Sequence, residues 1–307
     1  MAMFDQYRRQ VRLLMRLLPI VSREDCFALK GGTAINLFVR NLPRLSVDID
    51  LMYLPRHGRP EALANIDAAM KRIEASIKEE ISGARVTQHG SEGTVLRLLV
   101  IADGTQVKIE VSPVLRGVVQ EPIVMSVTEA VEDAYGFAET NVVSFEDLYA
   151  GKLVAALDRQ HPRDLFDVRD LLANEGLTDR LREAFVVYLL SHNRPMGEVL
   201  SGRRKNLVQE YKDGFEGMTN DPISIEDLMA AQETLIDQLI GGMPDKHRGL
   251  LIGFERGAPD WSLIDVPHAK DLPAVQWRQI NLATRTDDQR DALVTSLEAS
   301  LLRQSSR

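Results

Sequence analysis

An alternation of acidic and apolar residues at positions 47–51 constrains the fold of this chain more than any other feature. Val47, Ile49 and Leu51 alternate with Asp48 and Asp50. Alternate side chains of a β-strand share a face, so we expect the two carboxylates to project together while the apolar side chains enter a core. Two adjacent carboxylates repel each other unless a cation lies between them, and oxygen ligands suit Mg²⁺ or Mn²⁺. The sequence therefore predicts a metal site here, and the alternative is a solvent-exposed pair on an edge strand.

A pair of glycines lies upstream of these aspartates. Residues 27–29 predict a short strand, and Gly31 and Gly32 predict a tight turn where a backbone without side chains lets a phosphate come close. A helix is expected over residues 33–39, so that its free N–H groups would point at the phosphates. Thr33 is expected either to cap this helix or to contact a phosphate.

The composition limits the classes of protein to consider. The chain has 307 residues, is 44% hydrophobic and carries a net charge of -8, so any RNA contact must use a local basic patch rather than the overall field. Cys26 is the only cysteine, which excludes an intrachain disulfide and a cysteine-based metal site. No stretch of about 20 apolar residues appears, so a cytoplasmic location is expected.

A third carboxylate resembles the first two in its local sequence. Strands are predicted over residues 85–88, 94–100 and 106–111, and Glu110 lies between apolar neighbours in the last of these. The alternative is a residue that faces water and pairs with Lys108. Helices are predicted over residues 4–18, ended or bent by Pro19, and over residues 61–81.

A second informative stretch covers residues 149–171. Lys152 could meet a triphosphate as a point charge, and Asp164 and Asp167 are three residues apart, so they share one face of a helix. One of these acids could orient Lys152 or act as a base, while Arg159 and Arg163 could pair with the acids or touch phosphate. A purely structural network of ion pairs is the alternative. The remaining residues are predicted to be mostly helical.

Together these motifs carry a resemblance to a known family. The glycine pair followed by Asp-x-Asp resembles the nucleotidyltransferase signature, and with residues 149–171 the chain looks like the AbiEii/AbiGii (MenT-type) toxins of bacterial toxin–antitoxin and abortive-infection systems. The resemblance implies an α/β fold. It places a polymerase β-like nucleotidyltransferase domain with a mixed sheet at residues 1–140 and a mainly helical domain at residues 141–307. The second domain would contribute Lys152 and Asp167 to the active-site cleft.

The resemblance also implies roles for individual residues. Lys152 and Asp167 would be catalytic together with Asp48 and Asp50, and Glu110 would complete the set of metal ligands. The residues expected to bind the nucleotide are Lys30, Gly31, Gly32, Thr33, Ser46 and Asp164.

The implied reaction transfers a nucleoside monophosphate from an NTP to an acceptor with release of pyrophosphate, using Mg²⁺ or Mn²⁺. The implied acceptor is the 3′ end of tRNA, whose modification would stop translation, and a cognate antitoxin would be a partner. An RNA substrate predicts that basic residues of the N-terminal helix and of residues 203–205 surround one cleft. The alternatives are a protein or small-molecule hydroxyl as acceptor, or a switch that binds NTP without transferring it.

Overall fold

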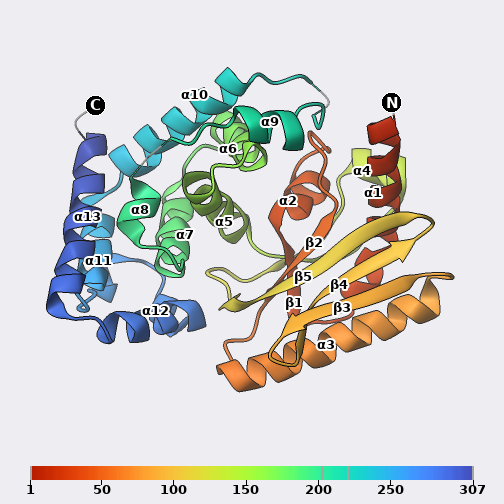
Figure 1. Ribbon diagram of the computed structural model, residues 1–307, viewed down its shortest axis with the longest axis horizontal. Coiled ribbons are helices and arrows are strands. Elements are labelled where there is room, and N and C mark those ends of the chain that lie inside the picture. Colours follow the sequence, from red (N-terminus) through yellow and green to blue (C-terminus); the bar gives the residue numbers. More distant parts are fainter. Residues whose placement is uncertain (1, 202–203, 220, 306–307) are drawn as a thin grey trace. The chain divides into compact units, whose positions relative to one another are not determined.

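The computed structural model describes residues 2–201, 204–219 and 221–305 (Figure 1). The chain divides into two compact units, Met1–Ser144 and Phe145–Arg307, and each is described by itself. The first unit contains a mixed β-sheet and the second is built of helices, so the predicted α/β fold is confirmed.

The sheet of the first unit has seven strands in the order β3-β4-β5-β2-β1-β7-β6. Strand β2 runs parallel to β5, and β1 runs parallel to β7, while the other neighbouring pairs are antiparallel. The strands are β1 (Phe27–Lys30), β2 (Asp48–Tyr53), β3 (Arg85–Ser91), β4 (Thr94–Ala102), β5 (Thr105–Arg116), β6 (Ile123–Ser126) and β7 (Glu139–Val142).

The two faces of this sheet differ in character because apolar and polar residues alternate along its central strands. Ile49, Leu98 and Ile109 are fully buried on one face, whereas the other face carries charged residues that are at least partly exposed: Asp48, Asp50, Arg97, Lys108 and Glu110. Helix α1 (Ala2–Val21) packs against β5, α3 (Arg59–Glu80) packs against β4, and the two helices contact each other. They therefore cover the apolar face and leave the charged face open.

Helix α1 continues two residues beyond Pro19, so the expectation that this proline ends the helix is wrong. Proline removes only one backbone donor, and Ser22 still donates its N–H to the carbonyl of Leu18. The rest of the first unit comprises α2 (Gly31–Ala34), the π-helix η1 (Ile35–Val39) and α4 (Glu129–Tyr135).

The second unit is formed by helices packed around apolar side chains such as Leu165, Phe185 and Phe254. Helix α5 packs against α6 and α7, and α10 packs against α6. None of the described helices has the length and apolar character needed to cross a bilayer. The helices are α5 (Phe145–Asp158), α6 (Pro162–Asn174), α7 (Asp179–Leu190), α8 (Met196–Leu200), α9 (Val208–Gly214), α10 (Ile225–Leu235), η2 (Ile236–Gly241), α11 (Asp245–Glu255), η3 (Trp261–Leu263), η4 (Ala269–Asp271), α12 (Pro273–Ala283) and α13 (Asp287–Ser305).

Candidate active site

The glycine pair forms the first two residues of α2, where the chain turns sharply out of β1, and this glycine turn lies directly against the acidic strand. Gly31 has a φ of 78°, and a Cβ atom placed on it would lie 2.5 Å from Oδ2 of Asp50. A Cβ atom on Gly32 would lie 2.6 Å from Oγ of Ser46 and 2.8 Å from Nη2 of Arg44. Neither position has room for a side chain, so the turn can approach both the carboxylate and the serine only because it consists of glycine.

Thr33 connects this turn to the start of β2. Its hydroxyl donates to the carbonyl of Asp48 at 2.5 Å and lies 3.3 Å from Oγ of Ser46. Thr33 is fully buried, and the N-cap of α2 is Lys30 without a side-chain cap. The expectation that Thr33 caps the helix is therefore wrong: its hydroxyl satisfies a carbonyl of the neighbouring strand and holds Asp48 in register.

The register of the sheet brings the three predicted carboxylates onto one face. Asp50 pairs laterally with Glu110 on β5 and with Lys30 on β1, and Glu110 pairs with Arg97 on β4. Laterally paired residues of neighbouring strands point to the same side, so these four residues form one row across the sheet. Asp48, two residues before Asp50, shares their face.

Two basic residues lie among these carboxylates. Lys108, the lateral neighbour of Asp48, places its Nζ atom 3.4 Å from Oδ2 of Asp48 and 2.8 Å from Oε2 of Glu110. Arg97 places its guanidinium 2.8 Å from the other oxygen, Oε1, of Glu110. Both carboxylate oxygens of Glu110 are therefore engaged in ion pairs.

These ion pairs shift the pKa values of their members in the expected directions. Burial disfavours the charged form of Glu110, but the hydrogen bonds from Arg97 and Lys108 outweigh it and lower the pKa of the carboxyl group. Burial likewise opposes the charge on Lys108, while the hydrogen bond to Glu110 and the nearby charges of Asp48 and Asp50 prevail and raise its pKa. Both groups are held in their charged forms.

The carboxylate oxygens of this face are of the kind that a hard divalent cation prefers. In the structure, the ammonium group of Lys108 lies between Asp48 and Glu110. Asp48 and Asp50 are partly exposed and share a face, as a metal site requires. Within the described residues, no three acidic, histidine or cysteine side chains converge as ligands. Asp48 and Asp50 are therefore the residues of this face that could hold a metal, and Glu110 could join them only if its ion pairs open.

The second predicted group of residues assembles between α5 and α6. Nζ of Lys152 lies 2.9 Å from Oδ1 of Asp164 and 3.0 Å from Oδ2 of Asp167. Arg159 donates through Nε to Oδ2 and through Nη2 to Oδ1 of Asp164, at 2.5 and 2.9 Å. Both aspartates and Lys152 are buried, so two negative and two positive charges balance within this cluster. Although burial opposes ionisation, the charges of Lys152 and Arg159 lower the pKa of Asp164 well below its usual range.

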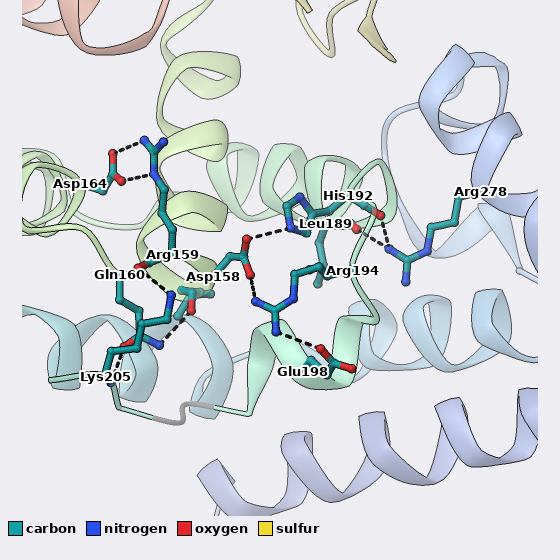
Figure 2. A network of polar contacts seen from close by, with 11 residues as sticks. Asp158, Arg159, Gln160, Asp164, Leu189, His192, Arg194, Glu198, Lys205 and Arg278 are labelled. Atoms are coloured by element: carbon teal, nitrogen blue, oxygen red, sulfur yellow. Dashed lines mark hydrogen bonds and ion pairs between the residues drawn. The ribbon is translucent and has the colours of Figure 1, made fainter. Parts of the chain in front are cut away.

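Figure 2 shows that polar contacts continue from this cluster around the end of α5. Lys205 donates from Nζ to the carbonyl of Arg159 at 2.9 Å and from its backbone N–H to Oε1 of Gln160 at 3.0 Å. Next to them, Asp158 pairs with His192 and Arg194. These contacts fix the end of α5, the helix that carries Lys152, together with Arg159, which directly follows it.

The sequence matches the family described as "Nucleotidyl transferase AbiEii toxin, Type IV TA system" over residues 12–278. This match covers most of the chain. The chain belongs to this family. It is therefore a nucleotidyltransferase, and its family is that of the toxins of type IV toxin–antitoxin systems.

A solved structure resembles this AbiEii protein over nearly its whole length. MenT4, described as a nucleotidyltransferase toxin from Mycobacterium tuberculosis H37Rv, aligns with a TM-score of 0.50 and 16% sequence identity, covering 94% of this chain and 89% of MenT4. At this identity the likeness shows a shared fold. A search of curated protein sequences gives no match.

The sequence predicted Lys108 only as an alternative partner of Glu110, and the structure shows this ion pair. It assigned no role to Arg97 or Arg44 in this AbiEii protein. To predict that Arg97 pairs with Glu110, the register between β4 and β5 has to be known. To predict the role of Arg44, one has to know that its side chain is buried beside Gly32. Of the predicted basic cluster, Arg203 lies outside the described residues, whereas Arg204 pairs with Glu233.

Proposed function

We propose that this AbiEii protein transfers a nucleoside monophosphate from an NTP to the 3′ end of tRNA in a metal-dependent reaction, and that this modification stops translation. The observation that carries the proposal is the contact between the glycine turn and the carboxylate of Asp50. It leaves a backbone without side chains next to a pair of carboxylates, which suits a nucleotide phosphate bound together with a divalent cation.

In the proposed reaction, residues of the first unit bind the metal and the nucleotide phosphates. Asp48 and Asp50 hold Mg²⁺ or Mn²⁺, which when bound polarises the phosphate and lowers the pKa of the attacking hydroxyl. The turn at Gly31 and Gly32 receives the phosphates through its backbone, and Ser46, packed against Gly32, lines the same position. Thr33 acts indirectly, because its hydroxyl fixes the backbone of Asp48.

The buried cluster of the second unit is proposed to serve the same reaction. Lys152 neutralises charge on the phosphates, and Asp164 and Asp167 orient its ammonium group, since both contact it. Arg159 balances the charge of Asp164, so that Lys152 can turn toward a phosphate and leave that charge balanced.

An RNA acceptor is supported by a local basic surface on an acidic chain. Helix α1 exposes Arg8, Arg9 and Arg12, while Arg16 on the same helix is paired with Asp103. Such residues contact phosphates without reading sequence, as recognition of a common tRNA end requires. The proposal places the protein in the cytoplasm, where tRNA and NTPs are found, together with a cognate antitoxin.

The test is transfer of label from each of the four α-labelled NTPs to total tRNA with Mg²⁺. Wild type is expected to label tRNA, Asp48→Asn to lose this activity, and Asp133→Asn, which changes an exposed carboxylate of α4, to keep it. Periodate oxidation of the tRNA, which destroys the 3′-terminal diol, is expected to abolish labelling. Label on protein or on a small molecule, with none on RNA, would contradict the proposed acceptor.

A further inference from the structure

Lys108 lies between Asp48, which the proposed reaction assigns to the metal, and Glu110, which would join the metal ligands only if its ion pairs open. We propose that its ammonium group takes the place of the divalent cation beside Asp48 in the metal-free protein. When the metal binds, this ammonium group moves to the nucleotide phosphates. Lys108 would thus make tight metal binding depend on the nucleotide. This inference rests on the proposed metal-dependent transfer.

The position of Lys108 follows from the register of the sheet. Lys108 is the lateral neighbour of Asp48 and shares its face with Glu110, two residues further along β5. Its Nζ atom lies 3.4 Å from Oδ2 of Asp48 and 2.8 Å from Oε2 of Glu110, so one ammonium group bridges the two carboxylates. A metal held by Asp48 would have to compete with this ammonium group for the carboxylate.

Charge balance explains why displacement would need the nucleotide. The carboxylates of Asp48, Asp50 and Glu110 carry three negative charges, and Lys30, Arg97 and Lys108 on the same face carry three positive ones, so the group has no net charge. A divalent cation changes this to +2 and places a second cation beside the oxygens that Lys108 contacts, where the two repel each other. The triphosphate of an NTP supplies the negative charge that accepts the released ammonium.

The side chain of Lys108 is suited to such movement. It has a compact charge on a flexible stem, and it is 28% exposed, so it can leave Asp48 without unfolding its surroundings. Arg97 on the other oxygen of Glu110 is a broader, planar cation that stays in place by its own ion pair. Because the ion pairs of Lys108 are partly solvated, we expect its competition to be worth roughly three- to tenfold in metal affinity.

The experiment measures two affinities by calorimetry. The first is that of Mn²⁺ without nucleotide, and the second is that of each α,β-methylene NTP at saturating Mn²⁺. Lys108→Met and Lys108→Gln remove the charge, and Lys108→Arg retains it. Lys71→Met is the matched control, because Lys71 is an exposed lysine of the same unit that pairs with Asp67 on α3. Thermal unfolding shows that each variant is folded.

The two affinities are expected to move in opposite directions. The neutral variants should bind Mn²⁺ alone roughly three- to tenfold more tightly and the nucleotide at least about threefold more weakly, whereas Lys108→Arg and Lys71→Met stay near wild type. A structural role would weaken both affinities, and this result, or no change in either, would overturn the inference. Wild-type Mn²⁺ binding that Asp48→Asn abolishes upholds the proposed metal site in either case. Wild type that binds no Mn²⁺, with or without nucleotide, would overturn both.

Discussion

The contact between the glycine turn and Asp50 predicts a large effect for Gly31→Ala. An alanine at a φ of 78° is strained by about 1–2 kcal/mol, of which about 0.4–1 kcal/mol is recovered because the unfolded chain loses freedom. In addition, the new Cβ atom would lie 2.5 Å from Oδ2 of Asp50, which has to move. Crowding of this kind costs about 1–3 kcal/mol. Together these contributions predict that Gly31→Ala lowers the free energy of unfolding by about 1–5 kcal/mol.

A second glycine of the same unit allows the loss of stability from backbone strain to be separated from the loss caused by the collision with Asp50. Gly83 has a φ of 73°, and a Cβ atom on it would meet nothing within 4 Å, so Gly83→Ala carries the backbone strain without the collision. Urea unfolding is expected to show that Gly31→Ala loses about 1–3 kcal/mol more than Gly83→Ala. Since a misplacement of about 1 Å at a reacting centre costs roughly 100-fold, the kcat of NMP transfer should fall by about that factor in Gly31→Ala only. Equal losses of stability with an unchanged kcat would refute this reasoning.

Three further predictions concern the buried polar contacts. Lys152→Met leaves Asp164 and Asp167 buried without their shared cation, so it should lower the free energy of unfolding by about 3–5 kcal/mol in urea titrations, and a loss under 1 kcal/mol would contradict the cluster. The depressed pKa of Asp164 gives stability that is present above the unfolded-state pKa of about 4 and lost as the pH falls toward the folded-state pKa. Below pH 4, stability should therefore fall more steeply with acid in wild type than in Asp164→Asn, and parallel curves would argue against this ion pair. Thr33→Val should lower the free energy of unfolding by about 1 kcal/mol and reduce NMP transfer, because it removes the hydroxyl that donates to the carbonyl of Asp48. Thr33→Ser keeps this hydroxyl and should retain wild-type stability and transfer. Similar results for the two variants would contradict that role.

The sequence predicted the elements around the active site well because their patterns are local. Alternation around Asp48 and around Glu110 predicted both strands, and the glycine pair predicted the start of the helix after β1. These patterns depend on residues close together in the chain. Alternate residues of one strand share a face, and this is why Asp48 and Asp50 could be assigned to one face.

What depends on partners distant in the chain could not be predicted. The lateral pairing of Asp50 with Glu110, and the bridge that Lys108 forms to Asp48, follow from the parallel register of β2 and β5. Thr33 was expected either to cap the helix or to contact a phosphate, because threonine often caps a helix start, and neither expectation included the strand carbonyl of Asp48 to which its hydroxyl donates. In the second unit, the sequence left open which aspartate contacts Lys152, and the fold brings both to it.

The most direct test of the proposed reaction is the mass of the 3′-terminal fragment of tRNA after incubation with the protein, Mg²⁺ and all four NTPs, followed by nuclease digestion. The proposal predicts that this fragment gains the mass of one or more nucleoside monophosphates with wild type and none with Asp48→Asn. A fragment of unchanged mass, while pyrophosphate is released and the NMP is found on another acceptor, would contradict the claim that tRNA is the substrate.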